Sequence, residues 1–237
     1  ARRLEEPNMA TNIPMPREQL ERVVRQIVRQ RHAEGLLAGD NPPAMAYAPN
    51  LAVNISARHM HISQADLQTL FGPGAELTVF RWLYQPGEFA SEQRVTVVGP
   101  RGRAIENVRI LGPIRPETQL EVSFTDTIAL GMDVPVRPSG KIDGTPGCKI
   151  IGPAGEIDMP RGVIRAERHV HMSPADAAVW GFSNGQYVKL RVISDCATTY
   201  EKVLCRVNEK FLLEVHLDTD EGNACDLVGA TGVELLA

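Results

Sequence analysis

The pattern Arg-His-x-His-x-Ser-x-Ala-Asp occurs twice in this chain, as Arg58-His59-Met60-His61-Ile62-Ser63-Gln64-Ala65-Asp66 and as Arg168-His169-Val170-His171-Met172-Ser173-Pro174-Ala175-Asp176. Aligned without a gap, the copies share the arginine, both histidines, the serine, the alanine and the aspartate. A match of this kind indicates an internal duplication rather than a chance similarity. We therefore expect two related halves, with function where the two copies meet.

The spacing of the histidines has a geometric consequence. Alternate side chains of a β-strand share one face, so His59 and His61 should point the same way while Met60 enters a core. His169 and His171 repeat the arrangement. Two imidazoles on one face can hold a metal ion, although a single His-x-His pair is as often an ordinary hydrogen-bonding pair. The repetition favours metal binding in both halves.

The composition is that of an ordinary globular protein, with 43% hydrophobic and 23% charged residues. No apolar run approaches the roughly 20 residues of a membrane helix, and no secretory signal peptide is recognisable. A net charge of −4 argues against a nucleic-acid partner. The cysteines form no Cys-x-x-Cys pair or disulfide framework, which favours a reducing cytoplasm: Cys148, Cys196, Cys205 and Cys225.

The N-terminal part contains one periodic segment. Residues 1–16 lack periodicity, and we expect a leader without regular structure. Residues 17–31 predict an amphipathic helix, because one face carries five apolar residues: Leu20, Val23, Val24, Ile27 and Val28. This helix either packs on its own domain or a dimer partner, or docks on a protein shell or an acidic surface. A linker at residues 41–43 follows.

Each His pair is expected to lie between a strand and a short helix. Residues 51–56 predict a strand that runs into the first pair, and Ser63 and Ser173 are typical caps of the helices that follow. Alternation predicts further strands at residues 77–83, 94–98, 104–111, 117–124 and 187–193. Many short strands and few helices predict a mainly β protein, with two β-barrel domains and short capping helices.

We expect three structural parts. Residues 1–35 form the leader and helix, residues 36–57 and 167–237 one discontinuous barrel domain, and residues 58–166 the other. Near the end, alternation makes His216 a possible third ligand. The Asp218–Asn223 segment that follows is interpreted as a functional turn, because it lacks the spacing of a calcium loop.

Beyond the two copies, four more segments occur in the order that they have in phosphate propanoyltransferases, the PduL-like phosphotransacylases. The resemblance spans about residues 52–233, and the segments are Val108-Arg109-Ile110-Leu111-Gly112-Pro113-Ile114-Arg115, Thr118-Gln119-Leu120-Glu121-Val122-Ser123, Arg137-Pro138-Ser139-Gly140 and Asp220-Glu221-Gly222-Asn223-Ala224. This resemblance implies two β-barrels with a two-zinc site at their interface. It also implies that residues 17–31 are either an encapsulation helix or the first structural helix after one.

Carried over by position, the resemblance implies two sets of zinc ligands: His59, His61 and Glu121, and His169, His171 and His216. Glu106 is the alternative carboxylate for the first set. Arg115 and Ser139 resemble phosphate ligands. Six residues resemble contacts to coenzyme A, with Arg81 where the family often has Lys: Ser56, Arg81, Arg109, Leu111, His216 and Asn223. For any of these arginines, the alternative is a solvated strand face.

The implied reaction exchanges phosphate and coenzyme A on a short acyl group, with propionyl-CoA as the expected substrate. We expect direct attack of zinc-bound phosphate on the thioester, with zinc as Lewis acid. An acyl-enzyme route through Cys148 or another cysteine is the alternative mechanism. A zinc-dependent thioesterase or other hydrolase, and a non-catalytic module with structural zinc, are the alternative functions.

The resemblance also implies a setting. We expect a homo-oligomer, most simply a dimer, in a bacterial cytoplasm and inside a microcompartment. Shell or cargo proteins of that compartment would be the partners of the N-terminal helix.

Overall fold

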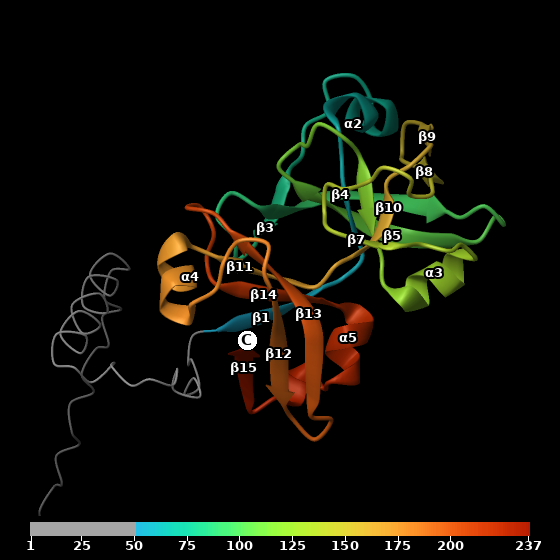
Figure 1. Cartoon of the computed structure of the whole chain (residues 1–237). Coiled ribbons are helices and arrows are strands. Elements are labelled where there is room, and N and C mark those ends of the chain that lie inside the picture. Colours follow the sequence, from blue (N-terminus) through green and yellow to red (C-terminus); the bar gives the residue numbers. More distant parts are fainter. Residues whose placement is uncertain (1–50) are drawn as a thin grey trace, which may run out of the picture. The chain divides into compact units, whose positions relative to one another are not determined.

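The computed structural model describes residues 51–237. The leader at residues 1–16, the amphipathic helix at 17–31 and the linker at 41–43 lie outside the described residues, so these predictions stay predictions. The described part is mainly β, as predicted, and consists of two curled half-barrel sheets with a few short helices (Figure 1).

The six-stranded sheet has the strand order β1-β14-β11-β13-β12-β15. It joins the first described strand to the C-terminal part of the chain. Its strands are β1 (Ala52–Ser56), β11 (His169–Met172), β12 (Tyr187–Ile193), β13 (Thr198–Val207), β14 (Glu214–Asp218) and β15 (Gly232–Leu236).

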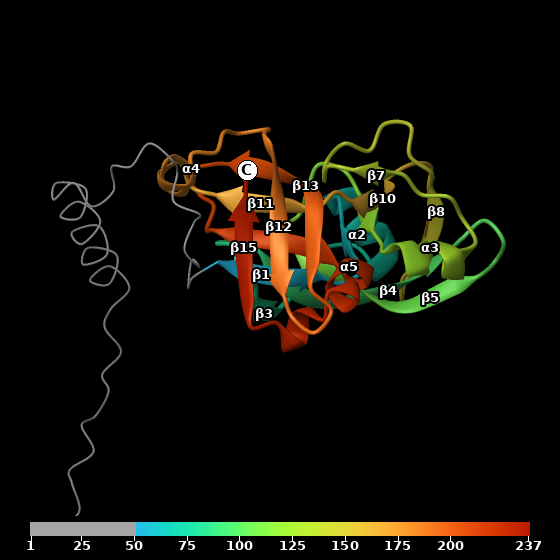
Figure 2. The same ribbon diagram turned by 60° about the horizontal axis from the view of Figure 1, so that its bottom comes forward.

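The nine-stranded sheet has the order β7-β10-β6-β2-β5-β4-β8-β9, with β3 paired to β4. Its strands are β2 (His59–His61), β3 (Val79–Trp82), β4 (Phe89–Val98), β5 (Ala104–Gly112), β6 (Gln119–Glu121), β7 (Val136–Arg137), β8 (Cys148–Ile151), β9 (Glu156–Met159) and β10 (Val163–Ala166). Figure 2 shows β4, β5 and β8 of this sheet on the other side of the described part from β12 and β15.

The chain crosses from one sheet to the other immediately before each His pair. β1 precedes β2 but pairs in parallel with β14, and β10 precedes β11 but pairs in parallel with β6. Figure 1 shows the blue strand β1 beside the orange and red C-terminal strands. The strand predicted at residues 51–56 is confirmed as β1, which ends at Ser56 shortly before β2 begins at His59. Backbone pairing with β14 places β1 in the sheet of the C-terminal strands.

The two His strands have equivalent neighbours. β2 pairs antiparallel with β6 and parallel with β5, while β11 pairs antiparallel with β14 and parallel with β13. All strands of the six-stranded sheet lie within residues 36–57 and 167–237. That these ranges form a separate barrel domain, and that the halves arose by duplication, stay predictions.

Two helices follow the His pairs at the predicted caps. They are α2 (Gln64–Phe71) and α4 (Pro174–Trp180), and the Ser63 and Ser173 side chains accept hydrogen bonds from the backbone N–H groups of Asp66 and Asp176. α4 ends at Gly181, whose φ of 68° belongs to the left-handed region that favours glycine.

Two further helices stand where the sequence predicts a strand and a turn. Residues 117–124 were expected to form one strand, but β6 covers only Gln119–Glu121 and α3 (Phe124–Leu130) begins after Ser123. The predicted turn after Asp218 is the helix α5 (Thr219–Ala224), followed by the 3₁₀ helix η1 (Leu227–Gly229). Both helices have a capping box, in which the residue before the helix and the third helical residue each accept a hydrogen bond from the backbone N–H of the other: Ser123 and Asp126 in α3, Asp218 and Glu221 in α5.

The arginine that opens each copy reaches one of these new helices. Arg58 Nη2 lies 2.8 Å from Asp126 Oδ1, and Arg168 Nε lies 2.8 Å from Glu221 Oε1. Each of these acids is the third helical residue of a capping box. The arginine of the repeated pattern therefore ties each His strand to the helix that follows the neighbouring antiparallel strand.

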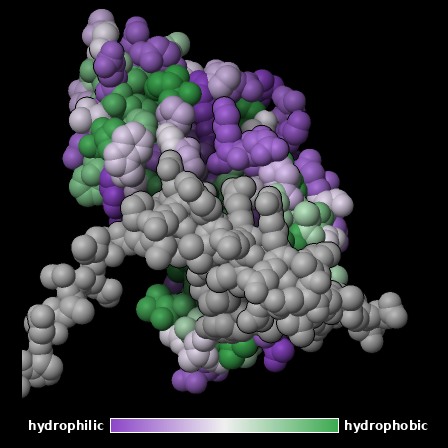
Figure 3. Space-filling view, turned by 90° about the vertical axis from the view of Figure 1, so that its left-hand side faces the viewer, coloured by the Kyte–Doolittle hydropathy of each residue, from purple (hydrophilic) through white to green (hydrophobic). Residues whose placement is uncertain are grey.

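Each sheet closes around its own apolar core. Met60 and Val170, between the histidines of each pair, are fully buried, which agrees with the predicted alternation. The described residues contain no helix that is long and apolar enough to cross a membrane. On the face seen in Figure 3, hydrophobic and hydrophilic side chains are interspersed over the described residues that are visible.

Candidate functional site

The first group of candidate ligands combines one His pair with a carboxylate. Antiparallel pairing of β2 with β6 places His59 opposite Glu121. His59 Nε2 and His61 Nε2 are 3.1 Å apart, and each lies 3.6 Å from a Glu121 oxygen. All three side chains are buried. We call His59, His61 and Glu121 the first triad.

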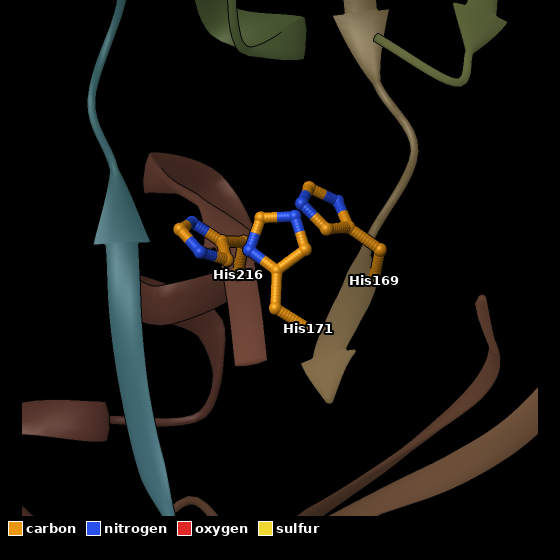
Figure 4. A group of neighbouring side chains, drawn as sticks. All are labelled: His169, His171 and His216. Carbon is orange, nitrogen blue, oxygen red and sulfur yellow. The ribbon is translucent and has the colours of Figure 1, made fainter. Parts of the chain in front are cut away.

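The second group consists of imidazoles alone. Pairing of β11 with β14 places His169 opposite His216, the position that corresponds to Glu121 in the other sheet. The three ring centroids are 4.8 to 4.9 Å apart. Figure 4 shows the rings of His169 and His171, from β11, gathered with that of His216, from β14. We call these three histidines the second triad.

The same contact orients one histidine of each pair. His59 Nδ1 lies 2.8 Å from the carbonyl oxygen of Ala57, and His169 Nδ1 lies 2.8 Å from that of Glu167. A carbonyl can only accept, so Nδ1 donates and Nε2 keeps its lone pair. This is the usual support of a metal-binding histidine.

Three buried nitrogens have no hydrogen-bond partner among the described residues: His61 Nδ1, His171 Nδ1 and His216 Nε2. Leaving such atoms unsatisfied is unfavourable. Within each triad the candidate ligand atoms lie within 4.8 Å of one another. Three imidazoles, or two and a carboxylate, are donor sets that suit zinc, and three protein ligands leave an open coordination position.

The protonation of the triads also suits a metal. Burial lowers the pKa of His61 to about 4, and burial together with neighbouring histidines lowers that of His169 to about 3 and that of His171 to about 2. Burial would raise the pKa of Glu121, but His59, His61 and Ser139 hold it well below its usual range. Neutral imidazoles and an ionised carboxylate are the forms that bind metal ions.

A hydrogen-bonded network joins the first triad to Arg115. Ser139 Oγ donates to Glu121 Oε1 at 2.7 Å and accepts from Arg115 Nη1 at 3.2 Å. Gln119 Nε2 donates to Glu121 Oε1 at 2.6 Å and to Ser139 Oγ at 2.9 Å. The backbone N–H of Gly140 donates to Gln119 Oε1 at 2.8 Å. The two expected phosphate ligands, Arg115 and Ser139, thus lie together beside the carboxylate.

Gln119 was not expected as a site residue, although a signal was present. It alternates with Glu121 on the same face of β6 and lies opposite His61. Glu214 has the equivalent position in the six-stranded sheet, opposite His171, and was missed as well.

Arg115 lies in a field of mixed charge. Burial lowers the pKa of its guanidinium, Glu121 and Glu88 raise it, and Arg206 lowers it again. Arg206 lies opposite His171 on β13 and also lowers the pKa of that histidine. The field of Arg206, from the six-stranded sheet, therefore reaches both Arg115 and the second triad.

A small cavity of about 20 Å³ borders both triads, and this is room for one or two water molecules. The residues that line it include Glu121 of the first triad and His169 and His216 of the second. The remaining lining residues come from both sheets and their connections: Ser56, Val122, Ala166, Glu167, Leu217 and Asp218. One ligand of the first triad and two of the second therefore border a common space.

Of the expected coenzyme A contacts, only Ser56 and His216 line this cavity. Arg81 on β3 and Asn223 on α5 are exposed, and Leu111 on β5 is half-buried. Arg109 donates to the carbonyl of Ser91, and its guanidinium carbon lies 4.3 Å from the ring centre of Phe80.

The two alternatives raised from the sequence lie elsewhere. Glu106 is exposed on β5 and belongs to neither triad, because Glu121 fills the place opposite His59. Cys148 is buried in the core of the nine-stranded sheet, and burial raises the pKa of its thiol to about 12. A thiol in that position is a poor nucleophile at neutral pH.

Comparison with known proteins identifies the family of this chain. The family model for phosphate propanoyltransferase matches residues 52–228. Over 222 residues the chain is 49% identical to a phosphate propanoyltransferase of Planctopirus limnophila, covering 93% of this chain and 91% of the relative. Over 180 residues it is 52% identical to one of Thermotoga maritima, covering 76% and 85% of the two chains. Over 211 residues it is 44% identical to one of Rhodopseudomonas palustris, covering 89% and 93%. The chain belongs to the phosphate propanoyltransferase family and is an acyltransferase.

Proposed function

We propose that this enzyme interconverts propionyl-CoA and phosphate with propionyl phosphate and coenzyme A. The observation that carries the proposal is the hydrogen bond from Arg115 to Ser139, whose hydroxyl donates in turn to the buried Glu121. Arginine offers a planar fork of donors that suits phosphate. The names of the relatives support a propionyl group as the group transferred and phosphate as its acceptor.

The two triads are proposed to hold one zinc ion each. Support comes from their donor sets, from the unsatisfied buried nitrogens and from the lowered histidine pKa values. Bound there with an open position, zinc would supply Lewis acidity for the bound phosphate, the thioester oxygen and the departing thiolate.

The chain's own residues are proposed to position the nucleophile. Phosphate bound by Arg115 and Ser139 is already an anion, so its oxygen can attack the thioester carbon without a strong general base. The C–O bond forms, the C–S bond breaks, and coenzyme A leaves as a thiolate. Arg115 donates to Ser139 through Nη1, its Nη2 lies 3.9 Å from Glu88 Oε1, and the guanidinium has further N–H donors for the phosphate.

Direct attack is favoured over an acyl-enzyme route. Cys148 and Cys205 are buried, and burial raises the pKa of their thiols to about 12 and about 11. Neither cysteine belongs to a triad or lines the cavity between them.

Coenzyme A is proposed to bind along residues from both sheets. Ser56 and His216 border the cavity, and Arg81 and Asn223 are exposed and accessible to a ligand. Arg109 and Leu111 complete the proposed set. The homodimer, the microcompartment location and the docking role of residues 17–31 are proposed from the family resemblance alone.

Assays with acetyl-, propionyl- and butyryl-CoA, each with and without phosphate, test the proposal. We expect release of free coenzyme A only with phosphate, fastest with propionyl-CoA, together with acyl phosphate in equal amount. Thioester cleavage without phosphate would identify a hydrolase. Absence of turnover in zinc-loaded protein would leave a non-catalytic module.

A further inference from the structure

A second buried carboxylate lies beside the second triad. Glu214 is 2% exposed and begins β14, two residues before His216 and directly opposite His171. Its Oε2 is 3.1 Å from His216 Nε2.

Two amides hold this carboxylate in place from different sheets. Asn54 Nδ2, on β1, donates to Glu214 Oε1 at 2.5 Å. Gln85 Nε2 donates to Oε2 at 2.6 Å from the connection between β3 and β4. Gln85 also exchanges hydrogen bonds with the backbone of Leu212, accepting from its N–H at 3.1 Å and donating to its carbonyl at 3.0 Å. The Glu214 carboxylate is thus held by Asn54, Gln85 and His216 in addition to its burial.

The equivalent position in the other sheet has no charge. Gln119 lies opposite His61 as Glu214 lies opposite His171. The first triad contains its own carboxylate, Glu121, whereas the second triad consists of three imidazoles and contains no carboxylate. Each triad therefore has one buried carboxylate near it, within the triad in one sheet and beside it in the other.

We propose that Glu214 is a positioning residue for the second triad: it restrains the His216 ring and supplies the negative charge that three neutral ligands lack for a divalent cation. Gln85, from the connection between β3 and β4 of the nine-stranded sheet, fixes the carboxylate in that role. The inference rests on the proposed binding of metal by the second triad, and a neighbouring carboxylate of this kind typically changes metal affinity by about 10–100-fold.

The test measures metal affinity rather than turnover. Full-length protein is freed of metal and titrated with Zn²⁺ against a chromophoric chelator, in the wild type and in Glu214→Gln. Gln keeps the size of the side chain and one acceptor for Gln85 but removes the charge. We expect one of two sites to weaken by about 10-fold or more while the other is unchanged. His171→Ala, which disrupts the second triad, identifies the weakened site.

Glu201→Gln is the matched control, because Glu201 is an exposed glutamate on β13 of the same sheet. It should leave both affinities unchanged. Gln85→Ala is the second variant, because it keeps the charge of Glu214 and removes its tie to the other sheet. It should weaken the same site by less than Glu214→Gln, and it decides the matter if Glu214→Gln does not fold.

Four results would count against the assignment or against the metal site on which it rests. Wild-type affinity in Glu214→Gln would overturn the role of Glu214, as would unchanged affinity in Gln85→Ala if only that variant folds. Equal weakening of both sites would indicate a general loss of structure. Wild-type protein with no second-triad site at all would instead overturn the metal binding of the proposed function.

Discussion

At the scale of single residues, Arg115 is the most direct test of phosphate binding. Arg115→Ala should lower kcat by roughly 10²–10³-fold, the loss typical of one preorganised donor. Arg115→Lys should recover only part, because a point charge cannot replace the planar fork. In both variants the KM for phosphate should rise and the KM for acyl-CoA should change much less.

Steady-state kinetics with each substrate varied separately measure this. Arg161→Ala is the control, because Arg161 is an exposed arginine whose partners, Glu117 and Asp143, belong to neither triad. A defect confined to acyl-CoA would reassign Arg115 to the coenzyme, and wild-type kinetics would make it an ordinary surface arginine.

The triads give a second prediction at this scale. Protein prepared without chelators should contain about two zinc ions per chain, because two three-ligand sets are available. His59→Ala should retain about one, since the second triad is built independently on β11 and β14. Elemental analysis of folded protein provides the measurement. One ion in the wild type and none in the variant would show that the triads share a single metal.

At the scale of elements, the capping box of α3 can be tested by itself. Ser123 Oγ accepts from the N–H of Asp126, and Asp126 Oδ2 accepts from the N–H of Ser123. Ser123→Ala should reduce the free energy of unfolding by about 1 kcal/mol, the usual effect of losing an N-cap. Thr125→Ala, at an exposed position of the same helix, should change it by less than about 0.5 kcal/mol. Denaturant unfolding monitored by circular dichroism measures both free energies. Equal effects of the two substitutions would contradict the capping role.

At the scale of the whole molecule, the buried histidines predict how stability depends on pH. In metal-free protein the folded pKa values of His61, His169 and His171 are lowered to about 4, about 3 and about 2. The unfolded chain takes up these protons near pH 6.5, so it binds more protons than the folded chain at acid pH. Stability is therefore complete above pH 6.5 and is lost as the pH falls toward 4 and below.

The size of this loss can be stated for one histidine. At pH 5 a histidine with a folded pKa near 4 reduces stability by about 2 kcal/mol, from about 1.36 kcal/mol per pH unit. Urea unfolding of metal-free protein at pH 7.5 and pH 5 measures the total. His169→Gln should show a shallower dependence than the wild type. A wild type that is equally stable at both pH values would contradict the burial of neutral imidazoles.

Much of the fold followed from local pattern. Alternation around Met60 and Val170 predicted strands with both histidines on one face, and Ser63 and Ser173 predicted the helix starts. The capping boxes of α3 and α5 were also readable, but alternation at residues 117–124 and the turn-like composition after Asp218 masked them. These are short-range interactions, so the residues that decide them lie within a few positions of one another.

Tertiary structure alone decided which strands become partners. β1 pairs with β14 and not with the His strand that follows it in the chain, because strand pairing depends on backbone groups that are far apart in sequence. The same long-range pairing brings Glu121 opposite His59 and His216 opposite His169, where the family resemblance had only implied their roles. It also ties Gln85 of one sheet to Glu214 of the other, 129 positions along the chain. The sequence thus determines the chemistry of each ligand, because it fixes the type of side chain. Which residues become its neighbours is determined by the tertiary structure, because they are far apart in the chain.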